Sequence, residues 1–266
     1  MEEERVKITV EDHVAEVAMV RSDKHNALDG DMFEAIAAAA ERLASEPGLR
    51  AVVLHGDGPS FCSGIDVGWL ADGQAEGFGE NAIKRDDFGA NLFQRVCTAW
   101  IEVPVPVIAA IHGNCLGGGL QIALGADIRL TTADAKLSIR EVHWGLVPDM
   151  GITATLPRLL SLDQAKDLTF TGRVIRGEEA VAVGLATRVE IDPLSASRQL
   201  AAEIAGRSPD AVRSAKQLFD TAWHDQGQAS LELESELQMA LIGSPNQMAA
   251  VMAGVTKEPP KFTDPA

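Results

Sequence analysis

The chain has 266 residues, of which 46% are hydrophobic and 23% are charged, as in an ordinary globular protein. No apolar run approaches the roughly 18 residues of a membrane-spanning helix, so we expect no membrane partner. Its 39 acidic and 23 basic side chains give a net charge of −16, which disfavours nucleic acid as a partner but still permits a small anionic ligand.

The N-terminal segment predicts a cytoplasmic protein that begins with a β-hairpin. Residues 1–5 are acidic, whereas a secretory signal peptide would begin with basic residues and continue with an apolar segment. Apolar and polar residues then alternate over 6–10 and 14–20 on either side of an acidic turn. This alternation is typical of two paired strands.

The next segments predict ββα-like units around a buried sheet. Apolar residues recur at three- and four-residue steps over 32–43, which indicates a helix. Residues 51–54 and 105–111 are short apolar segments, each followed by a glycine-containing loop, as buried strands often are. Residues 71–82 are rich in glycine and acidic side chains, which favours a mobile loop, and helical periodicity resumes over 83–101.

The last part of the sequence predicts helices alone. Proline and glycine separate four helical patterns, which span 195–205, 209–224, 229–242 and 246–255. We therefore divide the chain into a core of residues 1–195 and a helical oligomerisation region of residues 196–266. The apolar faces of the last helices need either the core or another subunit to cover them.

Two glycine-containing loops are the strongest candidates for a functional site. Residues 60–66 and 112–120 each follow an apolar strand and lead towards a helix, where unpaired N–H groups favour a developing negative charge. Their glycines let a ligand approach the backbone closely. These are the requirements of an oxyanion hole, although such a loop alone is more often only a tight turn.

Other kinds of site are not indicated. The second loop has Ile122 where a dinucleotide-binding fingerprint needs its third glycine, and no Gly-Lys-Ser/Thr follows for a P-loop. Ser63 is not in a G-x-S-x-G elbow. The six histidines lack the spacing of metal ligands, so we expect no metal. The three cysteines are too few and too widely spaced for a disulfide framework: Cys62, Cys97 and Cys115.

Taken together, five segments resemble the signature blocks of the crotonase superfamily, also known as the enoyl-CoA hydratase/isomerase family. They occur in the family's order and spacing along nearly the whole chain. These segments are Asn26-Ala27-Leu28, residues 61–66, residues 113–119, residues 126–129, and Glu141 with residues 145–149.

The resemblance implies an α/β fold, with a crotonase-type ββα spiral core and a C-terminal helical trimerisation region. It also implies trimers or dimers of trimers, and acyl-CoA thioester substrates whose coenzyme A enters as part of the substrate, with no separate cofactor. The oxyanion donors would be the N–H groups of Ile65 and Gly118. Residues in the matching positions would bind the substrate, those near the C-terminus sometimes from a neighbouring subunit: Lys24, His25, Ala27, Ser63, Gly64, Asp66, Gln121, Trp144, Lys257, Lys261 and Phe262.

The acid–base residues favour isomerisation over hydration. Glu141 occupies the position of one of the two hydratase glutamates, whereas Gln121 replaces the other and cannot exchange a proton at neutral pH. Asp149, eight residues after Glu141, resembles the pattern of dienoyl-CoA isomerases. Trp144 would help to exclude water from the site.

Alternatives remain open for these residues. Asp149 is also placed to cap the helix that follows, and Glu141 could form an ion pair with Arg140. We therefore expect an enzyme that shifts a double bond in an enoyl-CoA or dienoyl-CoA. The alternatives are a hydratase acting on 2-enoyl-CoA and a non-catalytic acyl-CoA-binding protein.

Overall fold

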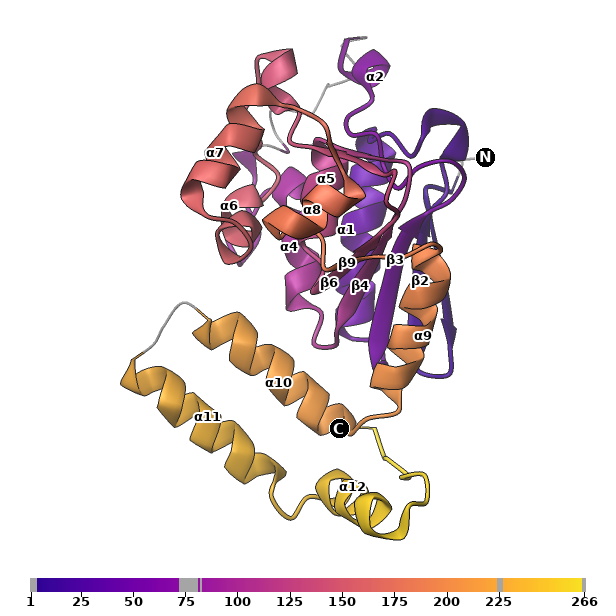
Figure 1. Ribbon diagram of the computed structural model, residues 1–266, viewed down its shortest axis with the longest axis vertical. Coiled ribbons are helices and arrows are strands. Elements are labelled where there is room, and N and C mark those ends of the chain that lie inside the picture. Colours follow the sequence, from indigo (N-terminus) through magenta and orange to yellow (C-terminus); the bar gives the residue numbers. More distant parts are fainter. Residues whose placement is uncertain (1–3, 72–80, 82, 224–226, 265–266) are drawn as a thin grey trace.

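The computed structural model describes residues 4–71, 81, 83–223 and 227–264 (Figure 1). The fold is α/β, as the sequence predicts. Its main sheet has the strand order β1-β2-β3-β4-β6-β9, and a smaller sheet has the order β5-β7-β8. The strands are β1 Val6–Glu11, β2 Val14–Met19, β3 Ala51–Gly56, β4 Val107–Ile111, β5 Asn114–Leu116, β6 Ile128–Thr131, β7 Lys136–Ser138, β8 Ile175–Arg176 and β9 Arg188–Val189.

The predicted N-terminal hairpin is confirmed. β1 and β2 pair antiparallel, with Val6 opposite Met19, whereas β2, β3, β4, β6 and β9 are joined by parallel pairing. Parallel strands place their carboxyl ends at the same edge of a sheet. The loops that follow β3 and β4 therefore emerge side by side, which brings the two glycine-containing segments together.

Helices cover both faces of the main sheet. Helices α1 Gly30–Ala44, α4 Leu92–Glu102 and α5 Gly118–Leu124 contribute to the larger apolar core with Val52 and Leu54 of β3. Helix α9, Pro193–Ala205, packs on the other face with Ala51 and Val53. Because both faces are buried, residues 51–54 are apolar throughout and do not alternate.

The remaining helical elements lie near the core or form the C-terminal region. Those near the core are η1 Ser22–Lys24, α2 Val67–Ala71, η2 Glu141–Trp144, α6 Ile152–Thr155, η3 Leu156–Arg158, α7 Leu162–Thr171 and α8 Gly177–Val183. The C-terminal helices α10 Pro209–Ala222, α11 Gln228–Leu241 and α12 Pro245–Thr256 extend away from the sheet (Figure 1). No described helix is both long and apolar enough to cross a membrane. The division at residues 195 and 196 stays a prediction, and α9, which contains it, packs on the sheet.

The helix predicted over 83–101 is wrong in its first half. α4 begins after Asn91, which forms a reciprocal capping box with Gln94. The residues just before it form a turn around Asp86, whose carboxylate accepts two backbone N–H groups. Side-chain acceptors therefore start the helix at Leu92, although the apolar periodicity alone would start it earlier. The mobile loop predicted over 71–82 lies mostly outside the described residues.

Candidate active site

A cavity of about 730 Å³ opens beside the loops that follow β3 and β4. These two loops are joined by backbone hydrogen bonds: the Cys62 N–H donates to the Asn114 carbonyl at 2.9 Å, and the Leu116 N–H donates to the Cys62 carbonyl at 3.0 Å. The cavity brings together seven residues that the sequence proposed: Ser63, Gly64, Ile65, Gly118, Glu141, Trp144 and Asp149.

Two backbone N–H groups of the cavity wall are available to a ligand. Within the described part of the chain, neither the Ile65 N–H nor the Gly118 N–H has an intramolecular acceptor. The two loops approach closely at Gly64, where an added Cβ would lie 3.8 Å from the Gly118 nitrogen and 2.8 Å from the Leu116 carbonyl oxygen. Gly64 also has a φ of +91°, so this close approach depends on glycine.

The position of Ile65 is fixed by its neighbours. The Leu28 N–H donates to the Gly64 carbonyl at 2.8 Å, and the Asp66 N–H donates to the Leu28 carbonyl at 2.9 Å. In such a ladder the residue between two bonded neighbours directs its own N–H away from the partner strand. The Ile65 N–H is therefore held in place and remains free to donate a hydrogen bond to a ligand.

Glu141 reaches the oxyanion loops from η2. Its Oε1 accepts a hydrogen bond from Gln121 Nε2 at 2.6 Å, whereas its Oε2 is buried without a hydrogen-bond partner in the described structure. A Cβ on Gly117 would lie 3.4 Å from Glu141 Oε1, so the carboxylate is directly beside the Gly118 donor. The hydrogen bond from Gln121 therefore holds Oε1, whereas Oε2 is available to accept a proton.

Gln121 links the Glu141 carboxylate to the backbone next to Asp149. Its Nε2 donates to Glu141, and its Oε1 accepts the backbone N–H of Met150 at 2.9 Å, one residue after Asp149. Gln121, expected among the substrate-binding residues, is completely buried on α5 and does not line the cavity. It therefore acts through the groups it holds, and this role needs an amide, which donates and accepts at once.

Both acidic groups are desolvated. Burial raises the pKa of Glu141 above its usual value, the hydrogen bond from Gln121 lowers it in part, and the charge of Asp149 raises it further. Desolvation also raises the pKa of Asp149, although this residue is exposed at the edge of the cavity. Carboxyl groups with raised pKa values are suited to accept and return protons near neutral pH.

The alternative roles for these carboxylates find no support in the contacts. The N-cap residue of helix α6 is Gly151, and no side chain caps this helix, so Asp149 does not cap it. Among the described residues, Glu141 has no ion pair with Arg140 or another base, and its polar side-chain contact is with Gln121.

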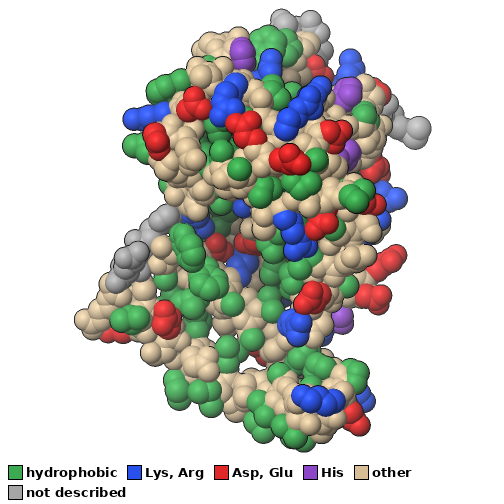
Figure 2. Space-filling view, viewed as in Figure 1, with side chains coloured by type: hydrophobic (Ala, Val, Ile, Leu, Met, Phe, Trp, Pro, Cys, Tyr) green, Lys and Arg blue, Asp and Glu red, His purple; other side chains and the backbone are tan. Residues whose placement is uncertain are grey.

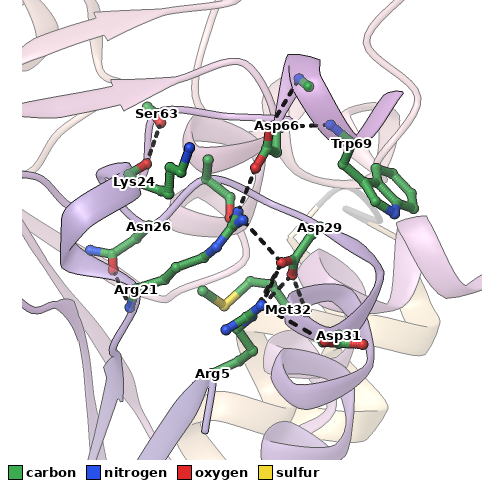
Figure 3. Close-up of polar contacts among 12 residues, drawn as sticks. Arg5, Arg21, Lys24, Asn26, Asp29, Asp31, Met32, Ser63, Asp66 and Trp69 are labelled. Atoms are coloured by element: carbon green, nitrogen blue, oxygen red, sulfur yellow. Dashed lines mark hydrogen bonds and ion pairs between the residues drawn. The ribbon is translucent and has the colours of Figure 1, made fainter. Parts of the chain in front are cut away.

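The loop that carries Ile65 is anchored by a network of ion pairs (Figure 3). The Arg21 Nη1 lies 2.8 Å from Asp66 Oδ2, and its Nη2 lies 3.3 Å from Asp29 Oδ2. Arg5 pairs with the same Asp29 carboxylate at 2.9 Å. Asp66 also accepts the N–H groups of Gly68 and Trp69 at the start of α2. The Asp66 side chain is therefore directed to Arg21 and α2, not into the cavity.

The other predicted binding residues lie in two places. Lys24, His25 and Ala27 belong to a loop held against the site, because the Ser63 N–H donates to the His25 carbonyl at 3.0 Å. Lys257, Lys261 and Phe262 do not line the cavity. The same segment contains Asp264, which pairs with Arg50 just before β3, at the opposite end of that strand from the site.

The cavity wall also contains residues that the sequence did not single out. Phe33, Phe93 and Met150 supply apolar surface, and Lys136, Arg140 and Arg176 supply positive charge. The segments that carry Phe33 and Phe93 had the apolar periodicity of helices, but nothing in it distinguishes a cavity wall from a core. Lys136 and Arg176 become neighbours only because β7 and β8 pair.

Comparison with known proteins shows which proteins this chain is similar to. The family model described as Enoyl-CoA hydratase/isomerase matches residues 9–265. The chain is 31% identical to the mitochondrial Delta(3,5)-Delta(2,4)-dienoyl-CoA isomerase of Mus musculus, covering 97% of this chain and 81% of that protein. It is 28% identical to a protein of Bacillus subtilis named a probable enoyl-CoA hydratase, covering 97% and 98% of the two chains. The crystal structure of an enoyl-CoA hydratase from Bacillus anthracis superposes with a TM-score of 0.88 at 27% identity, covering 97% and 99%.

Proposed function

This chain belongs to the enoyl-CoA hydratase/isomerase family, and we propose that it shifts a double bond in an enoyl-CoA or dienoyl-CoA thioester. Its family acts on acyl-CoA thioesters, so coenzyme A would enter as part of the substrate. The observation that carries the proposal is the arrangement of the unpaired Ile65 and Gly118 N–H groups beside a desolvated Glu141, next to which an amide replaces a second carboxylate.

The oxyanion hole would make the substrate protons α or γ to the thioester carbonyl more acidic. The thioester carbonyl oxygen would accept the Ile65 and Gly118 N–H groups, which stabilise the negative charge as an enolate forms. Glu141 Oε2 would take a proton α or γ to the carbonyl, and the electron pair of that C–H bond would move into the conjugated enolate. Return of a proton at the other carbon restores the thioester and completes the isomerisation, with no net gain or loss of protons.

The second carboxylate divides the possible isomerisations into two classes. With a 3-enoyl-CoA, Glu141 alone can remove and return the proton. With a dienoyl-CoA, the two proton positions lie further apart, and Asp149 would handle one of them. The two carboxyl groups interact, because the charge of Asp149 raises the pKa of Glu141.

Gln121 supports isomerisation over hydration. A hydratase of this family normally uses two glutamates on the added water, whereas Gln121 holds Glu141 and Met150 with its amide and has no proton to exchange. Cavity surface from Ile65, Leu116 and Trp144 would limit the access of water.

The same proposal includes self-association as a trimer or a dimer of trimers. Large hydrophobic side chains are exposed along α10–α12 (Figure 2): Phe219, Trp223, Leu231, Met239, Met248, Val251, Met252 and Val255. This is more apolar surface than a monomer usually exposes. Light scattering at micromolar concentration should give the mass of a trimer or hexamer, and a monodisperse monomer would contradict this part.

The reaction is tested with matched 2-enoyl-, 3-enoyl- and 3,5-dienoyl-CoA esters in D₂O, with mass spectrometry of the products. We expect isomerised products, deuterium incorporation, and hydration slower than isomerisation. Faster hydration of the 2-enoyl-CoA would show that Glu141 and Asp149 activate water despite Gln121. If acyl-CoA binds but no product forms, the protein is a non-catalytic binder.

A further inference from the structure

We propose that Met150 restricts the substrate to acyl-CoA thioesters that have no branch at the α carbon, the carbon next to the thioester. This role rests on the proposed function, in which the Gly118 N–H is an oxyanion donor and Glu141 is the base. It adds the class of acyl group that the same cavity accepts. The observation that carries it is the position of the Met150 side chain directly beside Gly118.

The Met150 thioether packs on the glycine that supplies the second donor. A Cβ added to Gly118 would lie 2.7 Å from Met150 Sδ and 3.1 Å from Met150 Cε. A backbone nitrogen and a Cβ are separated by only two bonds, so the thioether lies next to the donor N–H. Met150 is buried and lines the cavity. Its side chain is therefore a wall of the space that a thioester bound to Gly118 would enter.

The backbone of Met150 is fixed relative to the base. Its N–H donates to Gln121 Oε1 at 2.9 Å, and Gln121 Nε2 donates to Glu141 Oε1 at 2.6 Å. The next residue, Gly151, is packed against α4, where an added Cβ would lie 3.0 Å from Thr98 Cγ2. One buried amide therefore holds both the base and the backbone that carries the Met150 side chain.

The thioether has little space into which it could withdraw. A Cβ on Gly118 would also lie 2.8 Å from Leu28 Cδ1, and Leu28 is completely buried and does not line the cavity. Methionine adapts to irregular spaces, but protein interiors are close-packed, and here core atoms already surround the position. A larger group that enters beside Gly118 must therefore displace packed atoms.

These positions identify the part of the acyl group that meets Met150. In the proposed reaction the carbonyl oxygen accepts the Gly118 N–H, and Glu141 removes a proton from the acyl group. The α carbon is bonded to the carbonyl carbon, so it lies next to this donor. A methyl group on the α carbon would compete with the Met150 thioether for space, whereas an unbranched α carbon carries only hydrogen.

The test compares an unbranched 3-enoyl-CoA with its 2-methyl counterpart of the same chain length. Isomerisation of either ester removes a proton from C2 and returns one at C4. The enzymes are the wild type, Met150→Ala, and Met150→Leu, which nearly conserves volume. Leu156→Ala is the matched control, because Leu156 is as buried as Met150 and does not line the cavity.

We expect the wild type to have a kcat/KM about 10- to 100-fold lower for the branched ester, as for one methyl group in a packed apolar site. Met150→Ala should raise the ratio of branched to unbranched kcat/KM about 10-fold, and Met150→Leu should keep it low. Leu156→Ala should lower Tm and leave the ratio unchanged. The methyl group also makes the C2 proton less acidic, but this effect is the same in every variant and cancels in the comparison.

An unchanged ratio in Met150→Ala would overturn the proposal. An equal loss of rate for both esters would also overturn it, because Met150 would then support the oxyanion hole without selecting the acyl group. Thermal unfolding of each variant confirms that it is folded. If Met150→Ala does not fold, Met150→Val, which removes less volume, is measured in the same way.

Binding measurements separate this selectivity from the proposed reaction. Calorimetry with butanoyl-CoA and 2-methylpropanoyl-CoA, which have no double bond to shift, measures the discrimination without turnover. If Met150→Ala relieves weaker binding of the branched ester but no enoyl-CoA is isomerised, the proposed reaction fails and the selectivity stands. If isomerisation occurs but the ratio does not respond to Met150→Ala, the reaction stands and the selectivity is wrong.

Discussion

Two groups of charged residues lie on either side of the Ile65 loop, and they differ in how many hydrogen-bond donors surround each carboxylate. In the Arg5–Asp29–Arg21–Asp66 network, each carboxylate has guanidinium and backbone donors around it. In the cavity, Glu141 is desolvated, accepts one side-chain hydrogen bond, and leaves Oε2 buried without a partner.

This difference distinguishes carboxylates that hold the fold from a carboxylate that can take part in the reaction. A carboxylate whose partners are satisfied stays ionised and holds a loop, as Asp66 does: hydrogen bonds from Trp69 and Arg21 outweigh burial and lower its pKa. A carboxylate without partners is costly to bury but remains free to accept a proton. The ion-pair network therefore positions the Ile65 N–H, and Glu141 in the cavity remains able to act as a base.

The largest expected effect follows from neutralising the unpaired charge. Glu141→Gln should lower kcat for isomerisation by about 100- to 10,000-fold, because the amide cannot accept the proton, while CoA affinity and the fold persist. Steady-state kinetics and calorimetry on the same preparation measure both. A variant that keeps more than a tenth of the wild-type rate would show that Glu141 is not the main base.

Breaking the satisfied network should have a smaller effect on rate and a larger one on stability. Arg21→Gln removes the cation shared by Asp29 and Asp66, which should cost on the order of 3 kcal/mol of unfolding free energy. It should also lower kcat about 10-fold, since the Ile65 N–H loses its support.

The control for this change is Arg207→Gln, which removes an exposed helical ion pair with Glu203. It should cost less than about 1 kcal/mol and leave the rate unchanged. Denaturant unfolding and kinetics compare the two variants. If Arg21→Gln loses stability but no activity, the network does not position the oxyanion donor.

Asp149→Asn tests whether Asp149 and Glu141 have separate roles in proton transfer. We expect a loss of about 100-fold with a dienoyl-CoA, where two proton positions need two groups, and less than about 5-fold with a 3-enoyl-CoA. The ratio of the two rates is the measurement. Equal losses would mean that Asp149 acts through Glu141 by its charge.

The smallest effect concerns stability and pH. The pKa of Glu141 is raised above 4.5 in the native state, so its protonation favours folding. This contribution is fully present below the unfolded value and is lost as the pH rises through the native pKa. Glu141→Gln should therefore gain a few degrees in Tm relative to the wild type between pH 4 and pH 8.

The control for the pH effect is Glu178→Gln on α8, where the glutamate is exposed. Its Tm difference from the wild type should stay flat over the same range. A flat difference for Glu141→Gln as well would show that burial of this carboxyl carries no cost.

The local sequence determined much of this protein. Alternation over residues 6–20, apolar runs at β3 and β4, and the glycines at 64 and 117–119 predicted the strands and the donor loops, because pleat, burial and positive φ act over a few residues. Glu141 and Asp149 were proposed from the resemblance of their segment to the last signature block of the family. The helix predicted over 83–101 was half wrong, because caps at Asp86 and Asn91 overrode apolar periodicity.

The tertiary structure decided how charges are shared between distant segments. Arg5, Arg21, Asp29 and Asp66 form one network. Gln121 links the Glu141 carboxylate to the Met150 backbone. Lys136 and Arg176 lie side by side on the cavity wall because β7 pairs with β8. A sequence pattern reports which face a side chain occupies, whereas partners and desolvation depend on segments that meet only when the chain folds.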